Sequence, residues 1–389
     1  MKILTVDVGT GTQDIFLYDS NLHIENGFKL VVPSPTMIVH RLVKAATQAQ
    51  KPIVLTGVIM GGGPSAWAVE AHARAGLKTY ATPAAAKTLN DELEIVQASG
   101  IEIVSEDEVA ALPDSVQRIE FRDLDLPAIQ SALSPFGIDL SDLDAIAVAV
   151  FDHGNAPPGV SDRQFRFDYL DERIRERNSL AAFAYLADDI PPIMTRLQAV
   201  AVSAGDLHCP LVVMDTAPAA VLGASFDSTV SQRKRMILTN IGNFHTLAFR
   251  MGNDGIEGVF EHHTGEIDLQ KLDTLLHALA DGSLKHADVF DDMGHGALMY
   301  SEDVFEFGED DFDVVVTGPR RSMFPLTPTL SQGERGHLIP YFAAPFGDMM
   351  IAGCFGLLAA TAEVLPDLRE AVTKSMGEAG TGRPPWEID

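Results

Sequence analysis

Residues 3–19 read ILTVDVGTGTQDIFLYD, two extended segments joined by a glycine-rich turn. The apolar run at residues 3–8 ends in Gly-Thr-Gly-Thr at residues 9–12, and a second apolar run follows at residues 15–18. Short apolar runs bounded by glycine are typical of β-strands joined in a hairpin. The stretch therefore predicts a β-hairpin at the start of the chain.

The turn of this hairpin has the composition of a phosphate site. Glycines let backbone amides approach an anion, and threonine hydroxyls add donors. Asp7 and Asp14 flank the turn, where carboxylates suit a hydrated divalent cation. An ordinary Gly-Thr hairpin with Asp7 as a turn residue is the alternative. The candidate phosphate-binding residues are Gly9, Thr10, Gly11, Thr12 and Asp14.

The second half of the chain opens in a similar way. A strand at residues 211–214 leads into an alanine-rich helix at 217–224, and a second hairpin is predicted from strands at 235–240 and 246–251. The candidate phosphate-binding residues here are Gly242, Asn243, His245 and Thr246.

Three further strands end in candidate ligand-binding residues. The strand at 52–56 precedes Gly-Gly-Gly-Pro at 61–64 and a helix at 65–75, so the glycines either bind an anion at the helix amino terminus or make a tight connection. The strand at 144–151 ends in Asp152 and His153, and the strand at 313–317 ends in Gly318 and Pro319. Ligands in open α/β sheets gather at such carboxyl ends.

Other elements are less distinctive. Helices are expected at residues 37–49 and 269–280 and a strand at 116–121. The apolar run at 349–362 contains glycines and is shorter than a membrane span, so a buried helix is expected there.

A chain of 389 residues with 46% hydrophobic residues is long enough for two cores. We expect an α/β protein with a first lobe at residues 1–209 and a second at 210–376. Residues 326–336 lack apolar periodicity and are expected to form an exposed loop, and the Gly- and Pro-rich residues 377–389 a flexible tail.

Net charge and cysteine content limit the classes of binding partner and the cellular compartments that suit the protein. With 28 basic and 55 acidic residues the formal charge is −27, which disfavours nucleic acid as a partner. Two cysteines, Cys209 and Cys354, offer no disulfide framework or iron–sulfur motif. No membrane association is expected, and a reducing, cytoplasmic location fits best. A homo-oligomer is compatible with the sequence.

Histidines in glycine-flanked contexts suggest a metal site. A zinc or iron site would be satisfied by three histidine ligands from the set His262, His263, His295, His153 and His245. Because neighbouring residues of a strand point to opposite faces, only one of His262 and His263 is expected at any one site. Satisfied structural histidines are the alternative. Similarly, Arg163, Arg166 and Arg321 either clamp an anionic ligand or form surface ion pairs.

Residues 3–19 resemble the first phosphate motif of the actin-like ATPase superfold, which includes sugar kinases, Hsp70 chaperones and actin. Residues 213–220 and 236–251 resemble its interlobe helix and second phosphate motif, and residues 314–319 its adenosine motif. The resemblance implies a two-lobed, ribonuclease H-like α/β fold with an interlobe cleft for ATP and Mg²⁺. The second turn departs from the acidic, glycine-rich motif of the superfold at Asn240, Asn243 and His245, and this departure disfavours efficient metal-assisted hydrolysis of ATP.

Four other stretches resemble a prokaryotic family labelled pyruvate formate-lyase activating enzyme. They are TGVIMGGGP at 56–64, FDHGNAPPG at 151–159, EHHTG at 261–265 and AAPFGDMM at 343–350. A radical activase of that kind holds an iron–sulfur cluster with three closely spaced cysteines, which two distant cysteines cannot supply. The label is therefore not taken as the function.

The resulting expectation is a small-molecule kinase or ATPase whose partners are a nucleotide and an acceptor of unknown structure. Asp7 would position the metal and Asp152 would act as general base or metal ligand, with His153 contacting the substrate. A non-hydrolysing, nucleotide-dependent switch is one alternative. A metal-dependent transferase that uses His262, His263 or His295 is the other.

Overall fold

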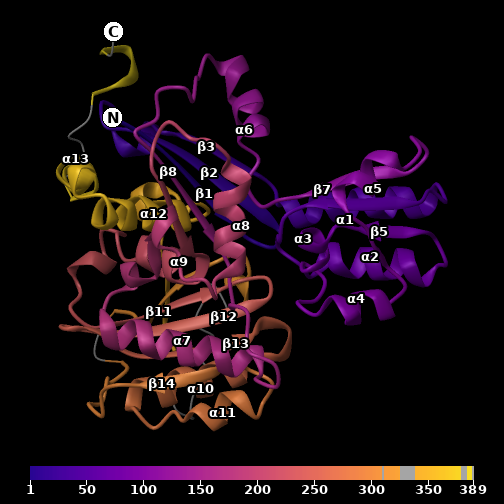
Figure 1. Cartoon of the computed structure of the whole chain (residues 1–389). Coiled ribbons are helices and arrows are strands. Elements are labelled where there is room, and N and C mark those ends of the chain that lie inside the picture. The colour runs from indigo at the N-terminus through magenta and orange to yellow at the C-terminus, as the bar shows by residue number, and fades with distance from the viewer. Residues whose placement is uncertain (309–310, 325–337, 378–382, 388–389) are drawn as a thin grey trace.

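The structure, a computed structural model, describes residues 1–308, 311–324, 338–377 and 383–387. Its strands form two six-stranded sheets and one four-stranded sheet. Figure 1 shows the two larger sheets stacked in one body, from which the smallest sheet projects with its helices.

The first sheet has the order β3-β2-β1-β8-β10-β9. Strands β1, β2 and β3 form an antiparallel meander, β8 and β10 run parallel to β1, and β9 is antiparallel to β10. The strands span Lys2–Val8 (β1), Thr12–Asp19 (β2), Phe28–Pro33 (β3), Ala145–Val150 (β8), Ala184–Leu186 (β9) and Leu211–Asp215 (β10).

The second sheet has the order β14-β13-β12-β11-β15-β16. Its strands β13-β12-β11-β15-β16 correspond to β3-β2-β1-β8-β10, whereas β14 and β9 are extra strands at opposite ends of the two sheets. Here β11, β12, β13 and β14 are successively antiparallel, and β15 runs parallel to β11. The strands span Met236–Ile241 (β11), His245–Gly252 (β12), Gly255–His263 (β13), Gly296–Met299 (β14), Val314–Thr317 (β15) and Pro340–Phe342 (β16).

An antiparallel meander continued by parallel strands on the side of its first strand, present twice in one chain, is the ribonuclease H-like unit duplicated in actin-like ATPases. The expected fold class is therefore confirmed by the strand order. Both predicted hairpins are present, as β1-β2 and β11-β12.

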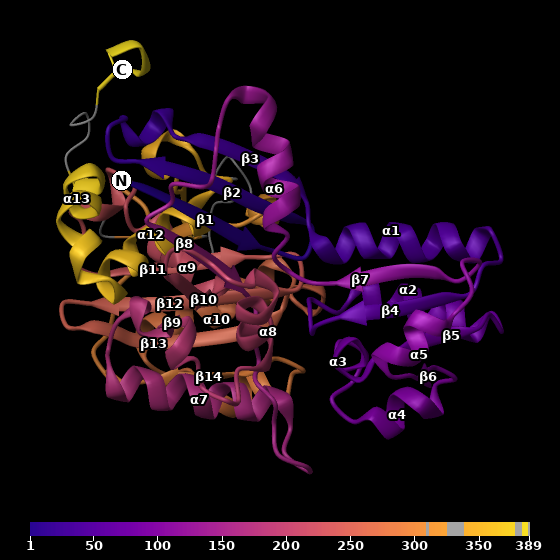
Figure 2. The same cartoon turned by 45° about the horizontal axis from the view of Figure 1, so that its top comes forward.

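The smallest sheet belongs to a separate unit inserted between β3 and β8. Its order is β6-β5-β4-β7, all parallel. Figure 2 shows this unit set to one side of the two-sheet body. It has a core of its own, which includes Val43, Ile53 and Phe121. Its elements span Pro35–Gln48 (α1), Ile53–Gly57 (β4), Pro64–Arg74 (α2), Thr79–Ala81 (β5), Pro83–Ala86 (α3), Leu93–Ala98 (α4), Glu102–Ile103 (β6), Glu106–Ala111 (α5) and Gln117–Phe121 (β7).

This inserted unit was not anticipated, because the sequence analysis assigned residues 1–209 to one lobe. Strand β10, Leu211–Asp215, lies beyond residue 209 but pairs with β8 in the first sheet. The first sheet thus extends past the expected division of the chain.

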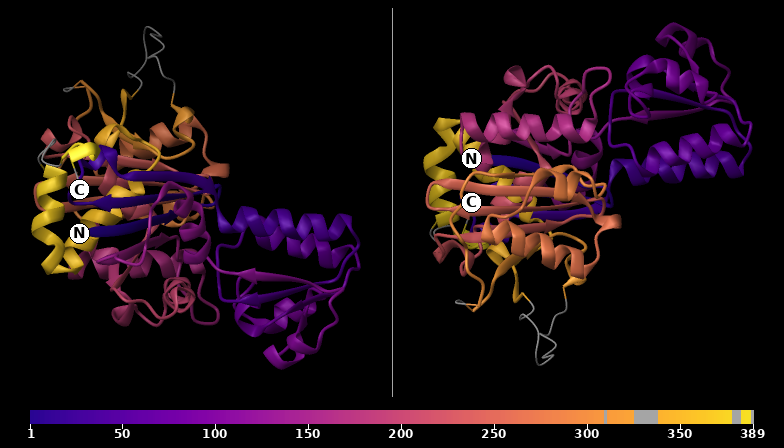
Figure 3. Two further views of the ribbon diagram at one scale, coloured as in Figure 1. Left: turned by 90° about the horizontal axis from the view of Figure 1, so that it is seen from above. Right: turned by 90° about the horizontal axis from the view of Figure 1, so that it is seen from below.

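Helices α9 and α12 fill the space between the two large sheets. Helix α12 packs on β1 and β8 of the first sheet, α9 packs on β11 and β15 of the second, and the two helices pack on each other. Figure 1 shows these helices between the strands of the first sheet and those of the second. Figure 3 shows both chain ends on the side of the two-sheet body away from the inserted unit. The remaining helices span Leu126–Leu133 (α6), Asp162–Glu176 (α7), Thr195–Ala204 (α8), Thr216–Ala224 (α9), Leu269–Asp281 (α10), His286–Phe290 (α11), Ala352–Val364 (α12) and Pro366–Gly377 (α13).

The predicted helices and strands are confirmed, with shifts of a few residues at their ends. The apolar run at 349–362 becomes α12, which is buried on almost every side. No helix among the described residues is long and apolar enough to cross a membrane. The loop expected at 326–336 lies outside the described residues, as do 378–382 and 388–389 of the expected tail, whereas Arg383 bridges to Leu22.

The crossing of α9 and α12 depends on glycine. A Cβ on Gly223 would lie 1.7 Å from the carbonyl oxygen of Ala352, and one on Gly356 would lie 1.9 Å from that of Ala219. Real Cβ atoms do not approach backbone this closely, so the helices can be this close only at glycine.

Replacing Gly356 by alanine should lower the free energy of unfolding by about 1–3 kcal/mol, because overpacking outweighs the intrinsic preference of a helix for alanine. Urea denaturation measures this change. Gly265→Ala is the control, since no heavy atom lies within 4 Å of its Cβ position. Equal stability of the two variants would contradict the argument.

Candidate functional site

The two hairpin turns open into one cleft of about 1130 Å³. The first turn at residues 9–12 and the second at 242–245 line it, together with the Gly61–Gly63 turn of the inserted unit. Gly318 and Pro319 also line the cleft beside the second turn. The structure thus brings the sequence-predicted phosphate and adenosine residues to one space, except Thr246, which is fully buried with its hydroxyl 3.0 Å from that of Thr264.

The two turns are in contact. A Cβ on Gly11 would lie 2.7 Å from Nδ2 of Asn243, so the Asn243 amide occupies the space that the glycine leaves open. Within the turns, the Gly9 amide donates to the Thr12 carbonyl and the Gly242 amide to the His245 carbonyl, each at 2.9 Å. The bends therefore face each other.

A pair of carboxylates lies at the base of the first turn. Asp7 and Asp14 are opposite each other on β1 and β2. Burial raises the pKa of Asp7 to about 6, with a contribution from the charge of Asp215, although Asp7 accepts a hydrogen bond from Thr216 Oγ1 at 2.5 Å. Burial and the charge of Asp7 raise the pKa of Asp14 to about 8, and its Oδ1 is buried without a hydrogen-bond partner. Within the described ranges neither carboxylate has a cationic partner.

Asp152 has a structural role, which corrects the expectation of a general base or metal ligand. Its Oδ1 accepts from the Gly154 amide at 2.9 Å, and its Oδ2 accepts from the amides of Arg196 and Leu197 at 2.9 Å each. The carboxylate therefore caps the amino terminus of α8. His153 lines the cleft, with Nδ1 2.7 Å from the Gly154 carbonyl oxygen.

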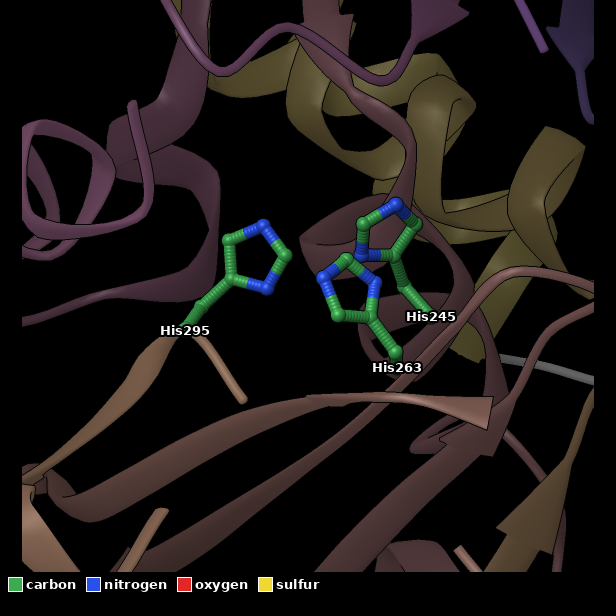
Figure 4. A group of neighbouring side chains, drawn as sticks. All are labelled: His245, His263 and His295. Atoms are coloured by element: carbon green, nitrogen blue, oxygen red, sulfur yellow. The ribbon is translucent and has the colours of Figure 1, made fainter. Parts of the chain in front are cut away.

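Three histidines from three strand ends form a cluster beside the second turn. His245 begins β12, His263 ends β13 directly opposite it, and His295 precedes β14. The ring centroids are 5.2 Å (His245 to His263), 4.9 Å (His245 to His295) and 4.7 Å (His263 to His295) apart. Figure 4 shows the three rings turned toward a common space.

His262 does not belong to this cluster, which corrects its expected role as a metal ligand alongside His295. It points to the other face of β13, fully buried, with Nε2 3.4 Å from an Asp292 carboxylate oxygen. The alternation of side chains along a strand separates it from His263, as expected. His245, expected both at the second phosphate turn and among the candidate metal-binding histidines, is the third member of the cluster.

A buried acidic network lies beneath the histidines. Arg166 is fully buried and donates from Nε to Glu261 at 2.5 Å and from Nη1 to Asp215 at 2.7 Å. Glu261 Oε1 lies 2.9 Å from Nδ1 of His245 and 3.7 Å from Nδ1 of His295. Arg166 is thus neither a ligand clamp nor a surface ion pair. Sequence reasoning missed Glu261, although its place two residues before His263 puts both on one face of the strand.

This environment keeps two of the histidines neutral. Burial, followed by the charge of His245, lowers the pKa of His263, and burial lowers that of His295 to about 3 despite the opposing effect of Glu261. Burial alone would raise the pKa of Glu261, but Arg166 and the histidines hold it well below its usual range. Neutral imidazoles have a lone pair available for a metal ion.

The Gly61–Gly63 turn serves as a connection and a docking surface. The Gly61 amide donates to Asp123 Oδ1 at 3.1 Å, so a protein carboxylate already occupies it. A Cβ on Gly63 would lie 2.5 Å from the ring of Phe244, which also meets Trp67 edge to face at 5.5 Å between centroids. The tip of the second turn therefore packs against the inserted unit.

Asp152→Ala should lower the free energy of unfolding by about 1–3 kcal/mol, because it leaves buried amides without an acceptor. Urea denaturation compares it with Asp188→Ala at an exposed position. If both variants were as stable as the wild type, the capping role of Asp152 would be wrong.

Stability should also depend on pH through Asp14. Because folding raises its pKa from the ordinary 3.8 to about 8, the folded state binds the extra proton, and stability falls as the pH rises from about 4 to about 8. The Asp14→Asn variant lacks this proton. The free energy of unfolding of each protein is measured in urea between pH 5 and 8.5. The difference between the variant and the wild type should therefore shift in favour of the variant as the pH rises. Parallel curves would refute the shift.

Comparison with known proteins gives one family and several distant structures. The family model described as "Putative pyruvate format-lyase activating enzyme (DUF1786)" matches residues 60–323. No curated protein matches the chain.

Solved structures similar to the chain include the "Lmo2764 protein, a putative N-acetylmannosamine kinase, from Listeria monocytogenes", with 9% identity, a TM-score of 0.25, and coverage of 66% of this chain and 49% of that one. The ROK hexokinase from Thermus thermophilus has 11% identity and a TM-score of 0.22, with coverage of 66% of this chain and 48% of that one. The PPX-GPPA enzyme of Aquifex aeolicus has 8% identity and a TM-score of 0.20, with coverage of 70% of this chain and 56% of that one. The chain spans about half the length of these structures.

Proposed function

The chain belongs to the DUF1786 family, and we propose that it is a nucleotide-binding protein of the phosphotransferase class, a small-molecule kinase or ATPase. One observation carries the proposal: the two glycine-containing turns, one from each lobe, face the same cleft. Backbone amides are the donors that such turns offer to phosphate oxygens. A chain with a formal charge of −27 needs local donors of this kind, because its overall field repels an anion.

The residues at the first turn fit a divalent cation of the magnesium class. Asp7 is buried and Asp14 is half-buried with an unpartnered Oδ1. Both carboxyl groups have raised pKa values, because they are shielded from water and no positive charge among the described residues stabilises their ionised forms. Asp7 and Asp14 would hold Mg²⁺ through oxygen ligands, directly or through water. The ion would supply charge neutralisation for the phosphates.

The packing around Asp7 supports this role. A Cβ on Gly353 would lie 1.8 Å from Asp7 Oδ2, and Thr216 donates to Oδ1. The carboxylate is thus fixed between the first residues of α9 and α12. A fixed carboxylate is what a metal or phosphate site requires.

The radical chemistry in the family's label does not fit the chain. Such an activase needs three closely spaced cysteine thiolates, and this chain has two cysteines, of which Cys354 is buried beneath β1 and β2. Burial and nearby carboxylates raise the pKa of the Cys354 thiol, which makes it a poor ligand.

A nucleotide-dependent switch that hydrolyses ATP slowly or not at all is the second candidate. The contact of Asn243 with Gly11 favours it, because a phosphate must displace or share the Asn243 amide at the point where the turns meet. Asn240 at the end of β11 adds no carboxylate for a metal ion there. Turnover distinguishes the two candidates, since the switch binds tightly and releases little ADP.

Calorimetric titration of ATP, GTP and phosphorylated metabolites with Mg²⁺ tests the proposal. We expect binding of a nucleotide by the wild type and at least tenfold weaker binding, about 1.4 kcal/mol, by Asp7→Asn. Asp188→Asn at an exposed position away from the cleft is the control and should bind like the wild type. Equal affinity of Asp7→Asn and the wild type would remove Asp7 from the site, and no binding of any nucleotide by the wild type would refute the proposal.

A further inference from the structure

We propose that His245, His263 and His295 bind one divalent transition metal ion of the zinc class, with its fourth position open to the cleft. This site is separate from the Asp7 and Asp14 carboxylates at the first turn. It does not depend on the proposed nucleotide site, because its ligands and its test involve no nucleotide.

The geometry comes close to that of a three-histidine centre. One nitrogen from each ring can be chosen so that all three lie within 4.8 Å of one another. A tetrahedral ion with Zn–N distances of about 2.0–2.1 Å places its nitrogens about 3.4 Å apart. Side-chain rotations that move each nitrogen by about 1 Å close this difference. The backbone of all three residues belongs to neighbouring strand ends of one sheet, so it need not move.

Glu261 orients two of the ligands. Its Oε1 faces Nδ1 of His245 at 2.9 Å and Nδ1 of His295 at 3.7 Å. The Nε2 atoms of both rings are therefore left for a ligand. Metal-binding histidines usually have a carboxylate behind the other ring nitrogen, which fixes the tautomer. Both Nδ1 atoms and Oε1 are buried without a well-formed hydrogen bond, and a small inward rotation onto a metal ion would let these bonds form.

Charge also favours a cation at this place. Glu261 and Asp215 carry two negative charges against the single positive charge of Arg166, and all three are buried. A divalent ion above the histidines compensates the remaining negative charge. Phe151 stacks on His245 with centroids 4.1 Å apart and on the Arg166 guanidinium at 4.2 Å, so an apolar wall shields this charge from water.

The ligand set selects the class of metal. Three neutral imidazoles suit Zn²⁺, Co²⁺ or Fe²⁺, whereas Mg²⁺ and Ca²⁺ prefer oxygen ligands. Among the residues that the structure describes, three protein ligands gather here, and all three residues line the cleft. The fourth position then takes water or an anionic oxygen of a molecule held by the second turn, whose last residue is His245 itself.

Metal content and cobalt spectroscopy test the site. Untagged protein is stripped with a chelator, reloaded separately with Zn²⁺ or Co²⁺, desalted and measured by elemental analysis. We expect about one equivalent per chain, with visible Co²⁺ absorption bands of tetrahedral intensity. His263→Asn should lose at least nine-tenths of the bound metal. His153→Asn is the matched control, a cleft histidine outside the cluster, and should retain it.

Glu261→Gln tests the positioning role. The amide keeps the shape of the side chain but removes its charge, so Co²⁺ affinity should fall about 10- to 100-fold and the absorption bands should shift. A thermal melt of each metal-free variant verifies that it is folded. Because His263 is only half-buried, the His263→Asn substitution should disturb folding least. Less than a tenth of an equivalent in the wild type, or equal metal in the wild type and a folded His263→Asn variant, would overturn the proposal.

Discussion

Helices α9 and α12 contact each other at Gly223 and Gly356, and this contact determines how the two lobes pack together. Each glycine faces a backbone carbonyl of the other helix, so the two axes are closer than any side chain allows. One helix packs on each large sheet, and their contact therefore sets the spacing of the lobes. The same contact sets the site, because Thr216 begins α9 and Gly353 lies in the first turn of α12, and both abut Asp7.

A second constraint is electrostatic. Arg166 on α7 joins Asp215, at the carboxyl end of β10 in the first sheet, to Glu261 on β13 in the second. Removing one partner of a buried ion pair leaves an uncompensated charge, which typically costs about 3–5 kcal/mol. The two ion pairs of Arg166 thus join the lobes, and one of its partners, Glu261, also lies beside His245 and His295 of the cleft.

The inserted unit completes the cleft from a third side. Its glycine turn receives Phe244 from the tip of the second hairpin, and Trp67 packs against the same ring. A ligand at the second turn is therefore bordered by residues of both lobes and of the insertion. Any movement of the inserted unit changes the surroundings of Asn243 and His245, since these residues adjoin Phe244 in sequence.

The local elements and the two turns follow from the amino-acid sequence alone. Alternation of apolar runs with glycine specifies β1-β2 and β11-β12, and strand periodicity separates His262 from His263, because these signals act between near neighbours in the chain. The roles of individual side chains depend instead on tertiary contacts. Asp152 caps amides 44 and 45 residues away, Glu261 meets an arginine 95 residues away, and the strands of residues 53–121 pair among themselves rather than with β1. Hydrogen bonds and strand pairings between distant segments leave no periodic trace in sequence, so only the folded chain determines which partner each group takes.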